Sequence, residues 1–250
     1  MRDSPRILLF DLETAPNIAY VWSLWNEVKS MDFVTSNWYV LCWAAKWLGE
    51  KKVLSSGIYN KGENDEKVMK DLWKLLDEAD IIIAHNAVKF DCRRVNTRFI
   101  ANKIAPPSPS IVIDTLKAAR KHFFFTSNRL NDLGKFFNVG CKMKTGGFDL
   151  WKRCMAGESL AWEKMVKYCK QDVKLLEKVY LKLRPYIKTH PNVGVYRDRT
   201  ACPRCGSKKI HYRGFAVTQA CKYRRFQCKN CGGWGRDKKS VLVNKMVSAI

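Results

Sequence analysis

Apolar runs along the first two thirds of the chain predict strands separated by helices. One run predicts a buried strand at Ile7–Thr14, and residues 38–47 and 51–59 predict a β-hairpin beside it. Further apolar runs at Ile81–Ala84 and residues 111–113 predict two more strands. This order of strand, hairpin, helix and strand indicates an α/β fold.

Helical spacing of apolar residues predicts the elements between the strands. Val68, Leu72 and Leu76 recur on one face, so a helix is expected from a cap at Asn64 or Asp65 to about residue 79. The sequence shows no internal repeat. The other predicted helices cover residues 91–102, 114–122, 130–137 and 159–187.

Composition adds a core and a strong charge to this picture. An apolar fraction of 46% with nine Trp, nine Tyr and twelve Phe allows a substantial core. The formal net charge of +23 favours a polyanion, above all nucleic acid, over a merely well-solvated surface. A membrane partner is disfavoured, because the sequence has no signal-peptide pattern and no apolar run near about 18 residues. We therefore expect a cytoplasmic protein whose ten cysteines are reduced.

Candidate chemistry begins at the end of the first strand, where Asp11 and Glu13 flank a single residue. Side chains two residues apart in a strand point to the same side of the sheet. Two adjacent carboxylates repel each other, and a divalent cation between them removes the repulsion. Hard oxygen ligands suit Mg²⁺ or Mn²⁺, whereas a solvated strand end is the alternative explanation.

The long predicted helix places another carboxylate in an unexpected position. At 100° per residue, Met165, Leu176 and Val179 fall on one side of this helix, with lysines opposite. Asp172 lies within the apolar stripe, and Tyr168, four residues earlier, shares its face. A carboxylate directed at the core is costly, so a metal site explains the position better than a water-filled notch.

Three motifs now stand in order: Asp11-x-Glu13, Asn86-x3-Phe90-Asp91 and Tyr168-x3-Asp172. Together they resemble the DEDD superfamily of 3′→5′ exonucleases, which has a ribonuclease H-like fold. The tyrosine of the third motif resembles that of the DEDDy branch. The sequences of the second and third motifs are most similar to those of proofreading exonuclease domains of family B DNA polymerases. The resemblance covers about residues 5–187. Since no polymerase domain follows, we expect a stand-alone nuclease or one that serves a separate partner.

The resemblance implies a role for each acid. Asp11 would bridge two Mg²⁺ or Mn²⁺ ions, Glu13 and Asp172 would complete the first site, and Asp91 would serve the second. Tyr168 would orient the attacking water, as a positioner rather than a strong base, because an ordinary tyrosine has a pKa of about 10. The resemblance also implies four positions near the terminal nucleotide: Leu12, Thr14, Asn86 and Phe90.

Several nearby residues have two interpretations. Core packing explains Phe90 about as well as substrate binding does. Asp114 resembles an acidic position between the second and third motifs, but capping of the helix that follows is the safer interpretation. The loop at 141–147, with Lys142 and Lys144, is expected either to grip a phosphate backbone or to form a plain surface turn.

The last quarter of the chain carries a different metal signature. Residues 188–250 contain 15 Lys and Arg but only two acids, a net charge of +13. Two Cys-x2-Cys pairs, each followed by glycine, supply four thiolates for one structural Zn²⁺, and the alternative is paired free thiols. The 22 residues between the pairs slightly exceed the usual spacing of about 15–20, which a longer hairpin accommodates. The predicted zinc ligands are Cys202, Cys205, Cys228 and Cys231.

Rings and cations interleave across this predicted zinc ribbon. Tyr212, Arg213, Phe215, Tyr223, Arg224, Arg225, Phe226 and Trp234 mix base-stacking and phosphate-binding groups, although some of the rings must form the small core. We expect an exonuclease domain at 1–187, a linker at 188–200 and the ribbon at 201–250. Residues 16–37 and 241–250 are candidate surfaces for a protein partner.

The sequence leaves three functions open. The first is a metal-dependent 3′→5′ exonuclease that acts on the 3′ end of single-stranded DNA, with the basic ribbon gripping the substrate. The second is the same activity on RNA, because nothing in the sequence reports a contact with a 2′-hydroxyl. The third is a non-catalytic adaptor that binds nucleic acid through the ribbon, and the presence of all four acids argues against it.

Overall fold

A computed structural model describes residues 4–23, 25, 30–197 and 200–243. The chain divides into two compact units, and each is described by itself. The larger contains Arg6–Lys117 and Thr126–Val179, and the smaller contains Met1–Pro5, Ala118–Phe125 and Tyr180–Ile250. The domain limits expected from the sequence, at 187 and 201, stay predictions.

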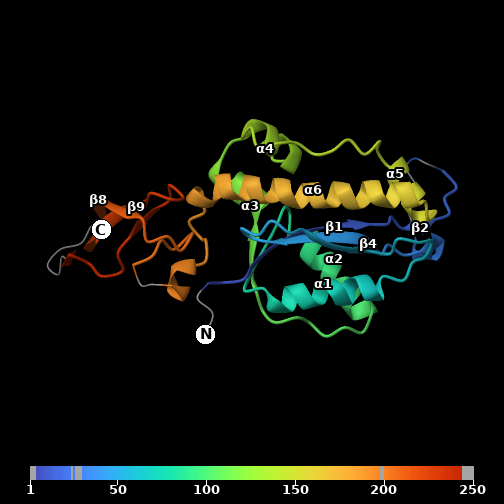
Figure 1. Ribbon diagram of the computed structural model, residues 1–250, viewed down its shortest axis with the longest axis horizontal. Helices are drawn as coiled ribbons and strands as arrows, with labels where there is room; N and C mark the ends of the chain where they lie inside the picture. The colour runs from blue at the N-terminus through green and yellow to red at the C-terminus, as the bar shows by residue number, and fades with distance from the viewer. Residues whose placement is uncertain (1–3, 24, 26–29, 198–199, 244–250) are drawn as a thin grey trace. The chain divides into compact units, whose positions relative to one another are not determined.

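A five-stranded mixed sheet organises the larger unit (Figure 1), with strand order β5-β4-β1-β6-β7. The central strand β1 pairs antiparallel with β4 and parallel with β6. Asp11 lies opposite Ala44 and Glu13 lies opposite Cys42, and the register shifts directly after Glu13. Regular pairing therefore ends where the two carboxylates stand. The strands are β1 (Ile7–Thr14), β4 (Val40–Trp47), β5 (Leu54–Gly57), β6 (Ile81–Ala84) and β7 (Ile111–Asp114).

Helices cover both faces of this sheet: α6 lies on one face, and α1 and α2 lie on the other (Figure 1). The mixed sheet between helices confirms the predicted α/β fold class. The short helix α5 was not predicted: of its seven residues only Leu150 and Cys154 are buried, whereas α4, of the same length, shows the apolar spacing of Leu130 and Leu133. The helices are α1 (Glu66–Glu78), α2 (Asp91–Ala101), α3 (Thr115–His122), α4 (Leu130–Phe136), α5 (Asp149–Met155) and α6 (Ser159–Leu183).

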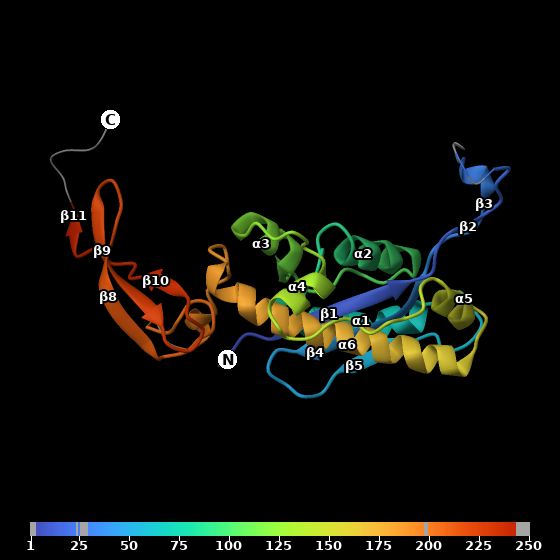
Figure 2. The ribbon, with the colours of Figure 1, turned by 90° about the horizontal axis from the view of Figure 1, so that it is seen from above.

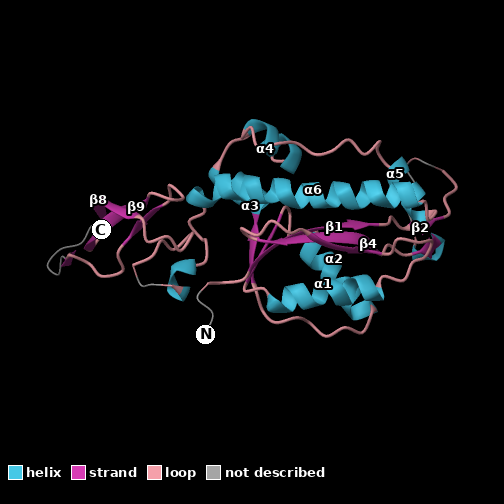
Figure 3. Cartoon of the chain, viewed as in Figure 1, coloured by secondary structure: helices cyan, strands magenta, loops and turns pink. Residues whose placement is uncertain are grey.

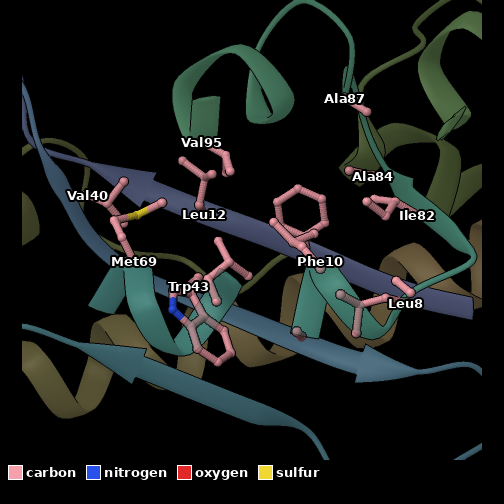
Figure 4. Packing of buried hydrophobic residues seen from close by; sticks show 14 of the residues in the cluster. Leu8, Phe10, Leu12, Val40, Trp43, Met69, Ile82, Ala84, Ala87 and Val95 are labelled. Atoms are coloured by element: carbon pink, nitrogen blue, oxygen red, sulfur yellow. The ribbon is translucent and has the colours of Figure 1, made fainter. Parts of the chain in front are cut away.

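Alternation along β1 directs its side chains to the two covered faces of the sheet, and Leu9, fully buried, shares its face with Asp11 and Glu13. Leu8, Phe10 and Leu12 point into an apolar cluster with residues of β4, α1 and α2 (Figure 4). Each of the three is at most 2% exposed. Because successive side chains of a strand point to opposite faces, Asp11 and Glu13 are directed to the side covered by α6. The packing of the even positions thereby fixes the direction of both acids.

The start of α1 shows how tertiary contacts override a local expectation. Of the two predicted caps, Asp65 holds the N-cap position, but Asn64 supplies the hydrogen bond, since its Oδ1 accepts from the Glu66 N–H at 2.9 Å. Asp65 is fully buried and makes no cap hydrogen bond. Its carboxylate instead accepts two hydrogen bonds from Arg98, at 2.7 and 2.8 Å, and one from Asn102 at 2.8 Å. This buried network ties α1 to α2.

The segment that follows β1 contains a small two-stranded sheet of β2 (Ile18–Ala19) and β3 (Val34–Ser36). The segment extends from the end of β1 beyond the central sheet (Figure 2). Tyr20, Trp22 and Trp25 are at least 77% exposed, which makes this an apolar surface. Residues 24 and 26–29 of the predicted partner surface at 16–37 lie outside the described residues. A protein partner for this segment stays a prediction.

The smaller unit is rich in strands (Figure 3), with β9 paired on one edge to β8 and on the other to β10 and β11. The long helix predicted to reach residue 187 ends at Leu183, because Pro185 lies in the 3₁₀ turn that follows. Its elements after α6 are the 3₁₀ turns η2 (Arg184–Tyr186) and η3 (Val193–Tyr196) and the strands β8 (Ile210–Val217), β9 (Cys221–Cys228), β10 (Trp234–Arg236) and β11 (Leu242–Val243). Residues 244–250 of the predicted docking segment lie outside the described residues.

Candidate active site

Three of the predicted acids meet where β1 faces α6. One carboxylate oxygen each from Asp11, Glu13 and Asp172 lies within 4.8 Å of the other two. Asp11 and Glu13 come from alternate positions of β1, and Asp172 comes from the face of α6 that packs on the sheet. The thiol of Cys169 donates a hydrogen bond to the Asp11 carbonyl at 3.6 Å, which holds α6 against β1 at this level. Three converging carboxylates form a site that suits a hard divalent cation.

Asp91 approaches the same cluster from α2 but is not one of the three closest acids. It is the first residue of α2 and only 1% exposed, and neither of its carboxylate oxygens has a hydrogen-bond donor among the described residues. The Oδ1 atom of Asp172 is likewise without a donor there. Buried carboxylate oxygens are costly when unpaired, so the unpaired oxygens of Asp91 and of Asp172 are each suited to coordinate a cation.

The pKa values report the crowding of these acids. Burial raises the pKa of Asp11 to about 7, with the charge of Asp172 adding to the rise and Lys142 opposing it. Burial, followed by the charge of Asp11, raises the pKa of both Glu13 and Asp91 well above the ordinary range. The charge of Asp11 thus reaches both neighbours. A bound cation would reverse these shifts by favouring the ionised carboxylates.

Lys142 enters the cluster from the loop between α4 and α5. Its Nζ donates to Asp172 Oδ2 at 2.6 Å and to the Tyr168 hydroxyl at 3.1 Å. Burial opposes the charged form of Lys142, but Asp172 and Asp11 outweigh burial and raise its pKa. A role for the 141–147 loop in phosphate binding was one of two sequence predictions, and the contact with the acids was not foreseen. The only sequence signal was the lysine pair in a glycine-rich loop.

Tyr168 lies one helical turn before Asp172 and shares its face, as the spacing predicted. Burial, followed by the charge of Asp172, raises the pKa of Tyr168. The hydroxyl therefore keeps its proton at neutral pH and accepts from Lys142, and its side-chain hydrogen bond with Asp172 lowers the pKa of that carboxyl. This geometry suits a group that orients a ligand rather than one that removes a proton.

Asp114 fixes the turn that leads into Asp91. Its Oδ1 accepts hydrogen bonds from the N–H groups of Leu116 and Lys117 at 3.0 and 3.1 Å, which confirms the predicted helix cap. The same carboxylate accepts from the N–H groups of Asn86 at 3.1 Å and Val88 at 3.2 Å. Asn86 has φ of 73°, a left-handed conformation that asparagine tolerates better than most residues. Asp114 therefore sets both the start of α3 and the path of the chain toward Asp91.

The four predicted substrate positions differ in their surroundings. The Leu12 side chain packs in the core and is 2% exposed, so its position gives no support to a side-chain contact with substrate. Thr14 Oγ1 accepts a hydrogen bond from Arg94 at 2.8 Å, and the Arg94 guanidinium stacks on the Phe90 ring at 4.2 Å. The sequence did not predict a role for Arg94. The feature that could have indicated one is its position, one helical turn after Phe90.

The four predicted zinc ligands also meet. Their Sγ atoms all lie within 4.8 Å of one another. Cys202 and Cys231 are 3.7 Å apart and Cys205 and Cys228 are 3.6 Å apart, too far for disulfides. A tetrahedron with metal–sulfur bonds of about 2.3 Å has edges of about 3.8 Å. The cluster thus has the dimensions of a four-thiolate metal site, as the Cys-x2-Cys pairs predicted.

Comparison with known proteins settles the family. Residues 37–184 match the family described as the RNase_H superfamily. The chain belongs to the ribonuclease H superfamily. The matched region of this ribonuclease H-like chain includes Asp91, Tyr168 and Asp172, whereas Asp11 and Glu13 on β1 precede it. Family membership confirms the fold implied by the three motifs.

A solved structure shares the fold. The ribonuclease H-like chain is similar to the family B DNA polymerase from the hyperthermophilic archaeon Pyrobaculum calidifontis, with a TM-score of 0.54 and 16% sequence identity. The similarity covers 73% of this chain but only 25% of the polymerase chain. A search of curated proteins by sequence gives no match. Among the described residues, no helix has the length and apolar character needed to cross a bilayer. Family and fold together support a nuclease-type function.

Proposed function

We propose that this ribonuclease H-like protein is a two-metal-dependent 3′→5′ exonuclease that acts on single-stranded nucleic acid, with DNA favoured. The observation that carries the proposal is the convergence of Asp11, Glu13 and Asp172, joined by Asp91, whose buried oxygens have no donor among the described residues. A merely structural acid of this kind would be paired, as Asp65 is with Arg98.

The residues fit two divalent cations, Mg²⁺ or Mn²⁺, on the chemistry of their donors. Asp11, Glu13 and Asp172 would hold one ion, and Asp91 together with Asp11 would hold the other. When bound, two such ions lower the pKa of the attacking water and stabilise the leaving 3′ oxygen in an in-line displacement at phosphorus. The protein itself supplies no nucleophile in this proposal.

The remaining residues position the reaction. The Tyr168 hydroxyl, which accepts from Lys142, would orient the attacking water. Lys142 offsets the charge of Asp172 and offers a cation to a phosphate oxygen. Arg94 stacks on Phe90 beside Thr14, where it would hold the terminal nucleotide.

Residues 201–250, within the smaller unit, are proposed to form a zinc ribbon. The four thiolates close the coordination shell of one Zn²⁺ and leave no open position, so this ion would hold the fold and would not hydrolyse substrate. The cationic surface of the ribbon would raise the local concentration of substrate.

A time course on 5′-labelled oligonucleotides tests the proposal. Single-stranded and duplex DNA and RNA are incubated with Mg²⁺, Mn²⁺ or EDTA, and products are resolved by length. We expect a ladder that shortens from the 3′ end, requires a divalent cation and disappears in Asp172→Ala. Cleavage at internal positions would indicate an endonuclease, and binding without any hydrolysis would indicate a non-catalytic adaptor. Comparison of the DNA and RNA ladders decides between deoxyribonuclease and ribonuclease.

A further inference from the structure

The sheet of the smaller unit has two chemically different faces, because its strands alternate and β9 lies in the middle. Pairing places Trp234 opposite Gln227 and Arg236 opposite Arg225, so these side chains share one face. Tyr223, two residues from Arg225 along β9, points the same way. Arg213, at the irregularity of β8, has its guanidinium 5.8 Å from the Trp234 ring and belongs to the same face. We call Arg213, Tyr223, Arg225, Trp234 and Arg236 the arginine face.

The opposite face is partly neutralised and partly buried. Tyr212 lies opposite Phe226, and Phe226 is only 6% exposed. Arg224 pairs with Asp237 at 2.8 Å, and the Tyr212 hydroxyl donates to the same carboxylate at 3.1 Å. Asp237 is the only acidic residue between 199 and 250. The arginine face therefore carries three guanidinium groups and no carboxylate.

Rings and guanidinium groups on the arginine face are already stacked on one another. The Arg225 guanidinium lies 4.9 Å from the Trp234 ring centre, and the Arg236 guanidinium lies 3.8 Å from the Tyr223 ring centre. Trp234 is 39% exposed, although an indole usually contributes to a core. Trp234 lies opposite Gln227, so the register positions of the two rings, Trp234 and Tyr223, are separated by four residues of β9, or about 13 Å. The face thus presents two flat stacking platforms with positive charge between them.

We propose that the arginine face binds single-stranded nucleic acid, with bases stacked on Trp234 and Tyr223 and phosphates bound by Arg213, Arg225 and Arg236. The rings select a single strand, because the faces of duplex bases are covered by their neighbours. The charge selects a polyanion. This inference rests on the proposed nuclease function for its ligand class, and it assigns substrate binding to one face of the ribbon.

Binding is measured in the full-length, zinc-loaded protein carrying Asp11→Asn, so that hydrolysis does not interfere. Fluorescence anisotropy follows a short fluorescein-labelled oligothymidylate and a labelled duplex over a range of salt concentrations. Trp234→Ala and Tyr223→Ala are each expected to weaken single-strand binding by about 5- to 150-fold, and Trp234→Phe is expected to retain most of it. Replacing Arg213, Arg225 and Arg236 by Gln is expected to flatten the salt dependence by about two units of slope.

The matched control replaces Lys229, Lys238 and Lys239 by Gln. These lysines are exposed and lie in the same unit outside the arginine face. Their replacement removes three positive charges, as the arginine variant does. We expect this control to bind single strands nearly as the parent does. Equal losses in the control and the arginine variant, with Trp234→Ala unchanged, would overturn the proposal in favour of diffuse charge. Circular dichroism and thermal unfolding check the fold of each variant, and Trp234→Phe and Arg236→Gln give the readout if Trp234→Ala unfolds.

The two proposals fail separately. Because Asp11→Asn removes hydrolysis by design, the binding result does not depend on catalysis. Unchanged single-strand binding after substitution of the arginine face overturns this inference alone. A wild-type protein that binds nucleic acid but does not hydrolyse it overturns the nuclease proposal alone.

Discussion

The acidic cluster and the cysteine cluster each gather side chains that suit metal ions, but different forces hold them in place. The acids stand on β1, α2 and α6, elements fixed by a large apolar core. The cysteines stand on a turn at 202–205 and on the end of β9 with the turn that follows it. Among the described residues from 200 to 243, only Ala201, Cys202, Phe226 and Cys228 are buried apolar residues.

This contrast indicates opposite relations between metal and fold. In the larger unit, packing holds several carboxylates together, and burial, with the charge of neighbouring acids adding to it, raises the pKa values of Asp11, Glu13 and Asp91. In the described residues from 200 to 243, the buried area is too small to support the fold alone, and we expect the metal to supply the missing stability. In the larger unit, the apolar core holds the acids in place independently of any ion. In the ribbon, we expect the bound ion to hold the fold in place.

The largest expected effect comes from Cys205→Ser. A structural zinc contributes about 10–16 kcal/mol of apparent binding free energy, so loss of one ligand is expected to release zinc and unfold the ribbon. Zinc content by atomic emission and limited proteolysis measure this, and hydrolysis of a dinucleotide should persist. The control is Cys141→Ser at an exposed free thiol. Retention of zinc and protease resistance in Cys205→Ser would show that the ribbon does not need its metal.

Asp11→Asn is expected to abolish most hydrolysis while leaving the fold intact, the opposite of Cys205→Ser. Loss of a carboxylate that would bridge both ions should lower the rate of hydrolysis by about 10³-fold or more. Its removal also relieves repulsion, so the melting temperature without divalent cations should rise or stay unchanged. Glu163→Gln on an exposed face of α6 is the control and should keep full activity. A large loss of thermal stability in Asp11→Asn would mean that the acid is structural.

Divalent cations should stabilise the larger unit in a pH-dependent manner. The folded-state pKa of Asp11 is raised to about 7, so protonation favours the folded state, and this stability is lost as pH rises through about 7. Mg²⁺ or Mn²⁺ at 100 times its Kd should restore about 2.7 kcal/mol, a rise in Tm of about 5–10 °C, and more at pH 8 than at pH 5. Differential scanning fluorimetry with zinc retained measures both trends. A Tm independent of Mg²⁺ and Mn²⁺ at pH 8 would argue against ion binding.

Lys142→Gln should have a smaller effect, about tenfold on kcat, because the lysine supports the acids and does not hold the ions. Removal of its charge should raise the pKa of Asp172 further, since Lys142 lowers that pKa at present. The acid limb of the pH–rate profile should therefore move to higher pH. Lys144→Gln in the same loop serves as the control. An unchanged profile in Lys142→Gln would show that this contact has no role in hydrolysis.

The sequence predicted the parts of the fold that local pattern determines. Apolar runs predicted the strands β1 and β6, and period-two alternation predicted that Asp11 and Glu13 share a side. Asp172 was identified because a carboxylate interrupts the apolar stripe of α6. These signals are strong because each follows from one element alone.

Contacts between distant segments could not be predicted in the same way. Lys142 reaches the acids because its loop is held along α6 by Lys164, Gln171 and Lys178, which donate to three loop carbonyls. No local pattern encodes this path. The dual role of Asp114 and the burial of Asp65 likewise depend on partners more than 20 residues away. Which side chains share a face of the ribbon depends on the pairing register of β9, and the spacing of the cysteines does not determine that register.

The alternation of β1 has a consequence for how this chain can change. Leu8, Phe10 and Leu12 alternate with Asp11 and Glu13 on a single strand, so an insertion or deletion of one residue would exchange the side chains that face α1 and α2 with those that face α6. Such a slip would direct both carboxylates into the apolar cluster and away from Asp172. We therefore expect changes of length to be tolerated in the exposed aromatic segment that follows Thr14, and not within the strand.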